Sequence, residues 1–149
     1  MRERKKELEK AEDDQIKDEL LSEGQFSTKV MISGNTVLVP VTLGYGGREV
    51  ETLLILDTGA SIIALHKDIA SKLSIYNTED SHAQVASGKV IETKLAKLSY
   101  VKVGPYKRTG MDAMIINHKG EGYGGLLGMN FLRGLNYSID FATQTIRWR

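Results

Sequence analysis

Hydrophobic and polar residues alternate through most of this chain beyond its first two dozen positions, which indicates β-strands. Valine or leucine occupies every second position from Val37 to Leu43, the period of a strand with one buried face. The turn Gly44–Gly47 follows, and alternation resumes over residues 50–56, so the pattern predicts a hairpin. The end of its second strand, Leu53–Leu56, is apolar at every position, which predicts burial on both faces.

Shorter segments of the same kind follow, most of them bounded by glycine, asparagine or aspartate. They predict strands near residues 83–86, 89–95, 98–103, 110–116, 137–141 and 145–149. Residues 66–73 have the character of one or two helical turns. Many short strands separated by close turns indicate an all-β domain with a closed or folded-over sheet.

The first residues have a different composition from the rest. Residues 1–23 contain six Lys/Arg and nine Asp/Glu, and their straight-chain side chains favour a helix. The apolar stripe on such a helix is thin, and Gly24 is a natural stop. We expect a charged helical leader or linker over residues 1–24 and one folded domain over 25–149.

Composition narrows the possible partners. The 149 residues carry a net charge of +1, which gives no general attraction to nucleic acid. No segment approaches the roughly 18 apolar residues of a membrane span, and the N-terminus lacks the apolar segment of a signal peptide. The chain has no cysteine, and its three histidines (His66, His82 and His118) lack metal-ligand spacing. As written, we expect a soluble chain without metal or cofactor, with these histidines on the surface.

The string Asp57-Thr58-Gly59 carries the candidate chemistry. An ionisable carboxylate directly after a buried strand is costly unless hydrogen bonds or another charge compensate it. The Thr58 hydroxyl can donate and accept, and Gly59 lets backbone N–H groups come close to the carboxylate. These features suit a carboxylate held for acid–base chemistry, and equally an aspartate that organises a turn.

A second string, Leu126-Leu127-Gly128, lies well downstream. The order of apolar strand, Asp-Thr-Gly-Ala, hairpin, Leu-Leu-Gly, short helix and final strand resembles the retropepsin family of aspartic proteases, especially its bacterial single-domain members. The resemblance covers roughly residues 36–141. It implies a retropepsin-like closed β fold, in which the strand of Leu126, Leu127 and Gly128 braces the catalytic loop.

The resemblance also assigns the active-site loop. Asp57 matches the catalytic aspartate, and Thr58, Gly59 and Ala60 complete the loop signature. In the family, the threonine hydroxyls hydrogen-bond across a dimer. The other aspartates precede neither Thr-Gly nor Ser-Gly, so no second catalytic aspartate is expected in this chain, and Asp140 is expected to be a turn or surface residue of the last hairpin.

A family flap, which is a hairpin that closes over substrate, matches residues 84–90 here. Its expected tip is Ala86, Ser87 and Gly88, where small residues permit a tight and mobile turn. An ordinary hairpin turn is the alternative. Retroviral members pair an aspartate after Asp-Thr-Gly-Ala with an arginine after the downstream glycine, whereas this chain has Ser61 and Met129 there. With both charges missing, neither is left unpaired.

Amide hydrolysis of this type needs two carboxylates that share a water, one ionised and one protonated. Because the chain supplies one, the prediction is a homodimer. The expected function is an endopeptidase that cuts peptide or protein substrates with an activated water. The alternative is a catalytically silent module that binds a peptide or partner. Bacterial relatives often carry an anchor or export signal before a charged linker, so a periplasmic or membrane-anchored location stays open.

Overall fold

The computed structural model describes residues 26–149. The leader expected at residues 1–24 lies outside this range. In chain order the elements are β1 (Ser27–Lys29), β2 (Met31–Ser33), β3 (Thr36–Tyr45), β4 (Arg48–Leu56), β5 (Ile63–His66), α2 (Lys67–Lys72), β6 (Glu79–Gln84), β7 (Val90–Val103), β8 (Tyr106–Ile116), β9 (Gly125–Leu127), α3 (Met129–Leu132), β10 (Tyr137–Asp140) and β11 (Thr145–Trp148). Strands dominate, so the predicted all-β class is confirmed.

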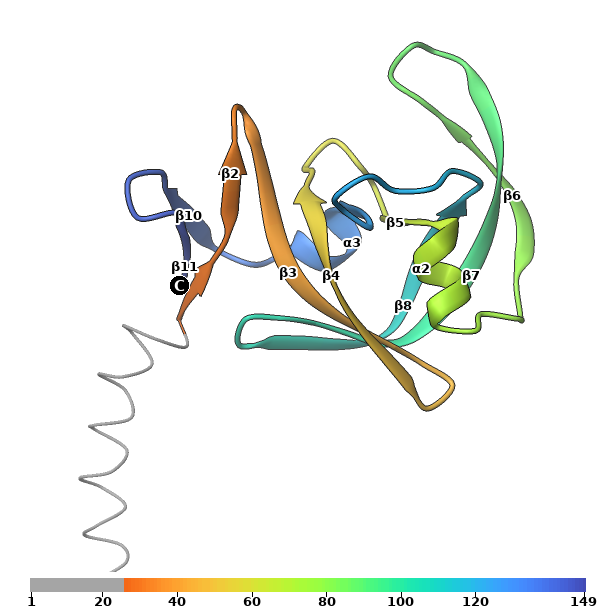
Figure 1. Cartoon of the computed structure of the whole chain (residues 1–149), viewed down its shortest axis with the longest axis horizontal. Helices are drawn as coiled ribbons and strands as arrows, with labels where there is room; N and C mark the ends of the chain where they lie inside the picture. Colours follow the sequence, from red (N-terminus) through yellow and green to blue (C-terminus); the bar gives the residue numbers. More distant parts are fainter. Residues whose placement is uncertain (1–25) are drawn as a thin grey trace, which may run out of the picture.

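Eight strands form one sheet that closes on itself (Figure 1). Its order is β2-β3-β4-β9-β5-β8-β7-β6, and an additional pairing of β3 with β7 joins six of the strands into a ring. The closing contact pairs Thr42–Gly44 with Tyr100–Lys102. Gly44 suits this contact because a Cβ atom at this position would overlap the Tyr100 ring unless that side chain moved.

A smaller sheet of order β1-β11-β10 lies beside the ring, at the left of Figure 1. Its first and last strands in the sequence pair directly, with Ser27 opposite Arg147. Gln144 ties this sheet to the larger one, because its carbonyl oxygen accepts from the Val30 N–H at 3.0 Å and its side-chain Oε1 accepts from the Ile32 N–H at 3.2 Å.

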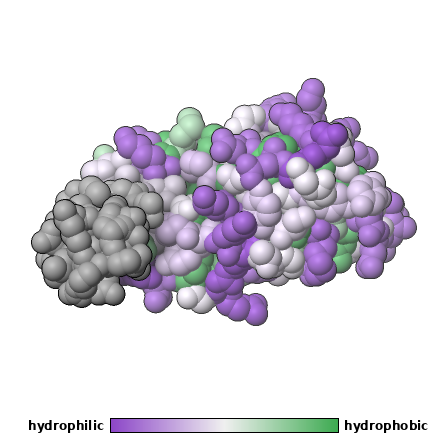
Figure 2. Space-filling view, turned by 90° about the horizontal axis from the view of Figure 1, so that it is seen from below, coloured by the Kyte–Doolittle hydropathy of each residue, from purple (hydrophilic) through white to green (hydrophobic). Residues whose placement is uncertain are grey.

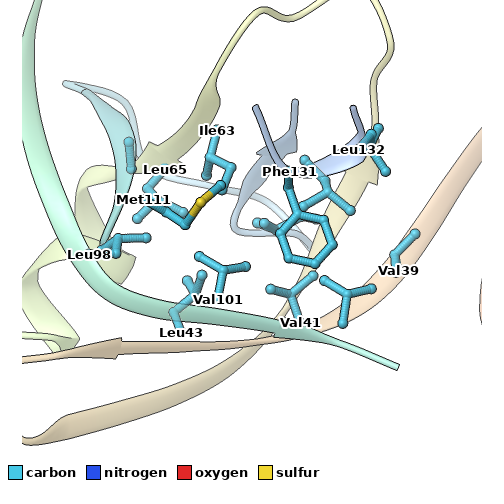
Figure 3. Close-up of a cluster of buried hydrophobic side chains, with 14 of the residues drawn as sticks. Val39, Val41, Leu43, Ile63, Leu65, Leu98, Val101, Met111, Phe131 and Leu132 are labelled. Atoms are coloured by element: carbon cyan, nitrogen blue, oxygen red, sulfur yellow. The ribbon is translucent and has the colours of Figure 1, made fainter. Parts of the chain in front are cut away.

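The inner side chains of the ring form the core (Figure 3). The alternation predicted for residues 37–43 is confirmed, since Val37, Val39, Val41 and Leu43 are all buried. Phe131 of α3 lies among them with no exposed surface. Burying one such side chain contributes about 1.5–3 kcal/mol, so the core fixes α3 firmly against the barrel.

Figure 2 shows the molecule from below the view of Figure 1, which is the side on which the β3–β4 turn lies. Hydrophilic and intermediate residues cover most of its visible surface, and hydrophobic residues lie in separate small patches. None of the helices within residues 26–149 has both the length and the apolar character needed to cross a membrane.

Several predicted boundaries were wrong. Strand β7 runs unbroken from Val90 to Val103, where two strands were predicted. Its side chains keep alternating from the part that pairs with β6 to the part that pairs with β3 in the ring. The strand predicted near residues 83–86 is β6, at Glu79–Gln84. It begins with two charged residues, so the hydrophobic pattern did not show where the strand starts. Strands β1, β2 and β5 were missed, since three or four residues show no periodicity. The turns at residues 66–73 form a helix, α2, so residues 26–149 contain a short helix besides α3.

Candidate active site

Asp57 directly follows the last residue of β4, one of the strands of the ring. Strand β4 is antiparallel to β3 and parallel to β9. The Asp57 N–H extends the parallel ladder by one bond, donating to the Leu127 carbonyl oxygen at 3.1 Å. The backbone of Asp57 is therefore held by the sheet, while its half-buried side chain can still reach solvent.

The residues after Asp57 fold back toward it. The Gly59 N–H donates to Asp57 Oδ1 at 2.9 Å, and the Ala60 N–H donates to the Asp57 carbonyl oxygen at 3.3 Å. A Cβ on residue 59 would lie 3.2 Å from Asp57 Oδ1, closer than ordinary contact, so glycine suits this bond. Thr58 is exposed, and none of the described residues hydrogen-bonds its hydroxyl.

Leu126 and Leu127 lie on β9, whereas Gly128, predicted as part of the same strand, follows it as the residue before α3. Together they contact the Asp57 loop. Gly128 packs so closely that an added Cβ would overlap the Ile62 carbonyl oxygen and lie 3.0 Å from that of Ala60. The first turn of α3 adds two bonds, Met129 N–H to the Ala60 carbonyl oxygen at 2.8 Å and Asn130 N–H to that of Ser61 at 3.0 Å. The structure thus brings residues 57–61 and 126–130 together as one unit.

Asn130 belongs to this unit, although sequence reasoning missed it. Its side-chain Oδ1 accepts from the Ile63 N–H at 2.9 Å, and its Nδ2 donates to the Asp112 carbonyl oxygen at 2.8 Å. One side chain therefore links the end of the Asp57 loop to β8. The available signal was an amide side chain directly after the Leu-Leu-Gly-Met string, where α3 begins.

Replacing Asn130 with alanine should lower the free energy of unfolding by about 1–3 kcal/mol, because the part-buried Ile63 N–H loses its acceptor. Urea denaturation followed by Trp148 fluorescence measures this. The matched variant is Asn130→Asp, which keeps an oxygen for the Ile63 N–H but sets its second oxygen against the Asp112 carbonyl oxygen. Its loss of stability should be smaller at acidic pH, where the protonated carboxyl can donate to that carbonyl, than at neutral pH. An Asn130→Ala variant as stable as wild type would contradict the role given to Oδ1.

The β6–β7 hairpin carries Ala86, Ser87 and Gly88 at its exposed tip. The turn is closed by Val85 N–H to the Lys89 carbonyl oxygen at 2.9 Å and Gly88 N–H to the Val85 carbonyl oxygen at 2.8 Å. Gly88 has φ +86°, which side chains rarely adopt. The hairpin extends beyond the barrel at the same end as the loop after β4 (Figure 1), and no hydrogen bond within residues 26–149 joins the two.

Other carboxylates of the described chain are bound elsewhere. Asp68 accepts from the Gly120 N–H at 3.2 Å, which lowers the pKa of this carboxyl. Asp80 pairs with Lys94 across β6 and β7, and the hydrogen bond from that lysine lowers the pKa of Asp80. Both groups are thereby held in the ionised form away from Asp57.

The last two described aspartates are also engaged. Asp112 pairs with Lys97 at 3.0 Å. Asp140 accepts from the Thr143 and Ala142 N–H groups at the β10–β11 turn, and these bonds, that of Thr143 foremost, lower its pKa. Asp140 thus has the turn position predicted for it. Among residues 26–149, Asp57 is the only aspartate located in the braced loop.

One histidine was misassigned. His66 is buried, with 6% of its surface exposed, because the loop between β8 and β9 covers it. Its Nδ1 lies 3.2 Å from the Tyr123 carbonyl oxygen, and its ring contacts those of Tyr123 and His118. His82 and His118 are both exposed as predicted. No group of three or more His, Asp or Glu able to hold a metal occurs in the described part of the chain.

Comparison with known families matches residues 39–131 to the family model described as Aspartyl protease. The chain belongs to the aspartyl protease family. The match runs from β3 to α3 and includes Asp57 and the whole braced unit. No curated protein gave a match.

Among solved structures, this aspartyl protease chain resembles a retropepsin-like aspartic protease from Rickettsia conorii. The TM-score is 0.62 and the sequence identity 18%, over 82% of this chain and 87% of that one. The likeness establishes the fold, so the predicted retropepsin-like architecture is confirmed.

Proposed function

We propose that this protein is an aspartic endopeptidase whose active site forms from two copies of the chain, each contributing Asp57. The observation that carries the proposal is the solitary carboxylate at the head of a loop fixed by β9 and α3, in a chain of the aspartyl protease family. A braced position is what acid–base catalysis requires, because the reacting groups must hold their geometry through the reaction.

The proposed chemistry follows from the meeting of two like charges. Two carboxyl groups about 3 Å apart cannot both ionise easily. The pair therefore retains one proton over a pH range in which a lone carboxyl group would already be ionised. The ionised Asp57 takes a proton from a shared water, and the protonated one donates to the carbonyl oxygen of the substrate. The Gly59 N–H orients one oxygen of each carboxylate.

Two other features have proposed roles. The exposed Thr58 hydroxyl is free to hydrogen-bond to the second copy, which would fix the two loops relative to each other. The exposed tip of Ala86, Ser87 and Gly88 offers backbone groups to a bound peptide, so the β6–β7 hairpin serves as a flap. Neither role requires a metal or cofactor.

The test is incubation of purified protein with a mixed peptide library at acidic and neutral pH, with mass-spectrometric detection of products. Products should appear, and activity per milligram should rise with protein concentration until the dimer is saturated. Activity per milligram that is independent of concentration in a monomeric sample would contradict the shared site. A folded dimer that yields no product would favour the binding module instead.

A further inference from the structure

The face of the barrel wall that carries Asp57 can be traced from the strand register. Leu54 is fully buried in the core, so the next residue of β4, Ile55, points to the opposite, outer face. The Asp57 N–H extends the ladder of β4 by one bond, so the alternation places the Asp57 side chain on the same outer face as Ile55. Pairing across the sheet adds residues of four neighbouring strands to this Asp57 face, namely Leu126 of β9, Ala64 of β5, Met114 of β8 and Leu95 of β7.

His66 lies on the Asp57 face at the other end of β9. It follows Ala64 by two positions on β5, so its side chain points to the same side of the sheet. The His66 N–H donates to the Gly124 carbonyl oxygen at 2.8 Å, just before β9 begins, whereas Asp57 bonds to the last residue of β9. The loop of residues 117–124 covers His66, and in the view of Figure 1 it passes between the β4–β5 loop and the β6–β7 hairpin.

The imidazole of His66 fills the space under this loop. Its Nδ1 lies 3.2 Å from the Tyr123 carbonyl oxygen, and because a carbonyl oxygen only accepts, the hydrogen bond places a proton on Nδ1. The ring also contacts the rings of Tyr123 and His118. A Cβ on residue 120 would overlap both His66 Nδ1 and the Tyr123 carbonyl oxygen, so Gly120 lets the loop come this close to the imidazole.

The two residues after His66 attach the loop as well. The Lys67 N–H donates to the His118 carbonyl oxygen at 3.0 Å, and Asp68 Oδ1 accepts from the Gly120 N–H at 3.2 Å. Every second residue of 120–124 is glycine, so the free backbone of this loop has many conformations open to it. The contacts from residues 66–68 select one of them.

We propose that His66 is a positioning residue for peptide binding, whose imidazole holds the 117–124 loop as a wall at one end of the Asp57 face. The inference rests on the proposed function, because such a wall matters only if a peptide lies along the Asp57 face. The loop of Asp57 is braced separately, by Gly128 and the first turn of α3. Displacing the 117–124 loop should therefore weaken peptide binding and leave the chemistry at Asp57 unchanged.

A pair of substitutions separates the hydrogen bond of His66 from its ring. His66→Phe keeps an aromatic ring under the loop and loses the bond to the Tyr123 carbonyl oxygen, whereas His66→Asn places an amide N–H near the position of Nδ1. With a library peptide as substrate, His66→Phe should raise KM about fivefold or more, in keeping with the loss of one hydrogen bond, and leave kcat within about twofold of wild type. His66→Asn should recover most of this rise. An equal KM in both variants, or a fall in kcat without a rise in KM, would overturn the role given to His66.

Asp68→Ala tests the same loop from a partly exposed position, where the fold should survive the substitution. Hydrogen exchange followed by mass spectrometry should show residues 117–124 exchanging about fivefold faster or more in Asp68→Ala and in His66→Phe. The amides of β7 at residues 96–103 should keep their wild-type rates, since equal acceleration there would mean a general loss of stability and would contradict the proposal. Lys72→Ala, at the exposed last residue of α2, is the control and should change neither segment.

Exchange and kinetics together separate this inference from the protease proposal. Faster exchange of the loop with unchanged KM would overturn the inference, because the loop would then not border the bound peptide, and would leave the protease intact. A wild-type protein that retains a labelled library peptide without cutting it would contradict the protease. The dissociation constant of that peptide then replaces KM, and its rise in His66→Phe would support the wall on its own. A wild-type protein that neither binds nor cuts any peptide would overturn both.

Discussion

A ninefold excess of Asp57→Asn chain, mixed with wild-type chain, is expected to leave roughly a tenth of the wild-type peptidase activity if the copies pair at random in a tight dimer. The substitution removes the ionisable group but keeps a side-chain oxygen for the Gly59 N–H, which lies 2.9 Å from Asp57 Oδ1 in the native loop. The variant should therefore fold and pair, and each mixed dimer would hold a single carboxylate.

The Asp57→Asn chain alone should lose activity by about 10³-fold or more, in keeping with the contribution of acid–base groups. The measurement is the initial rate of cleavage of a peptide identified from the library, with an equal mass of an unrelated protein as the control for dilution. Unchanged activity in the mixture would show that each chain works alone. Unchanged activity of the variant by itself would remove Asp57 from the mechanism.

Replacing Gly128 with alanine should cost about 3 kcal/mol or more of unfolding free energy, in the range of severe core changes. The new Cβ would overlap the Ile62 carbonyl oxygen and lie 2.5 Å from the carbonyl carbon of the same residue. Both atoms are backbone, so relief requires the Asp57 loop to move away from β9. Chemical denaturation measures the loss, and cleavage by the remaining folded protein should fall as well.

Gly134→Ala is the matched control for that substitution. Gly134 has φ +82° with no atom within 4 Å of an added Cβ, so alanine there suffers only the left-handed backbone conformation, about 1–2 kcal/mol. The φ angle of Gly128 is −97°, which any residue adopts, so its cost is one of space. Equal losses from the two variants would mean that the close packing of Gly128 against the loop is not important.

The sequence pattern located the centre of the candidate site because its signals are local. Asp57 directly follows a buried strand, and the alternation of Val37 to Leu43 reports one buried face. The fit between Gly128 and Ile62 depends on two segments separated by more than 60 residues. Only the family resemblance suggested that these segments meet.

Other features could not be predicted because they arise from packing between distant segments. The ring closes where Gly44 accommodates Tyr100, and neither residue signals the other in the sequence. Asn130 is of a residue type common on surfaces, yet its side chain joins Ile63 to Asp112. His66 looks like any isolated histidine until the loop after β8 folds over it.

The pairing of Ser27 with Arg147 has a consequence for engineering the connectivity of this domain. A short linker could join residues 26 and 149 beside the small sheet, and new termini could open at the exposed Gly46–Gly47 turn. Such a circular permutant would keep every strand neighbour of the barrel, and its ends would lie far from both the tip of the β6–β7 hairpin and the loop of Asp57.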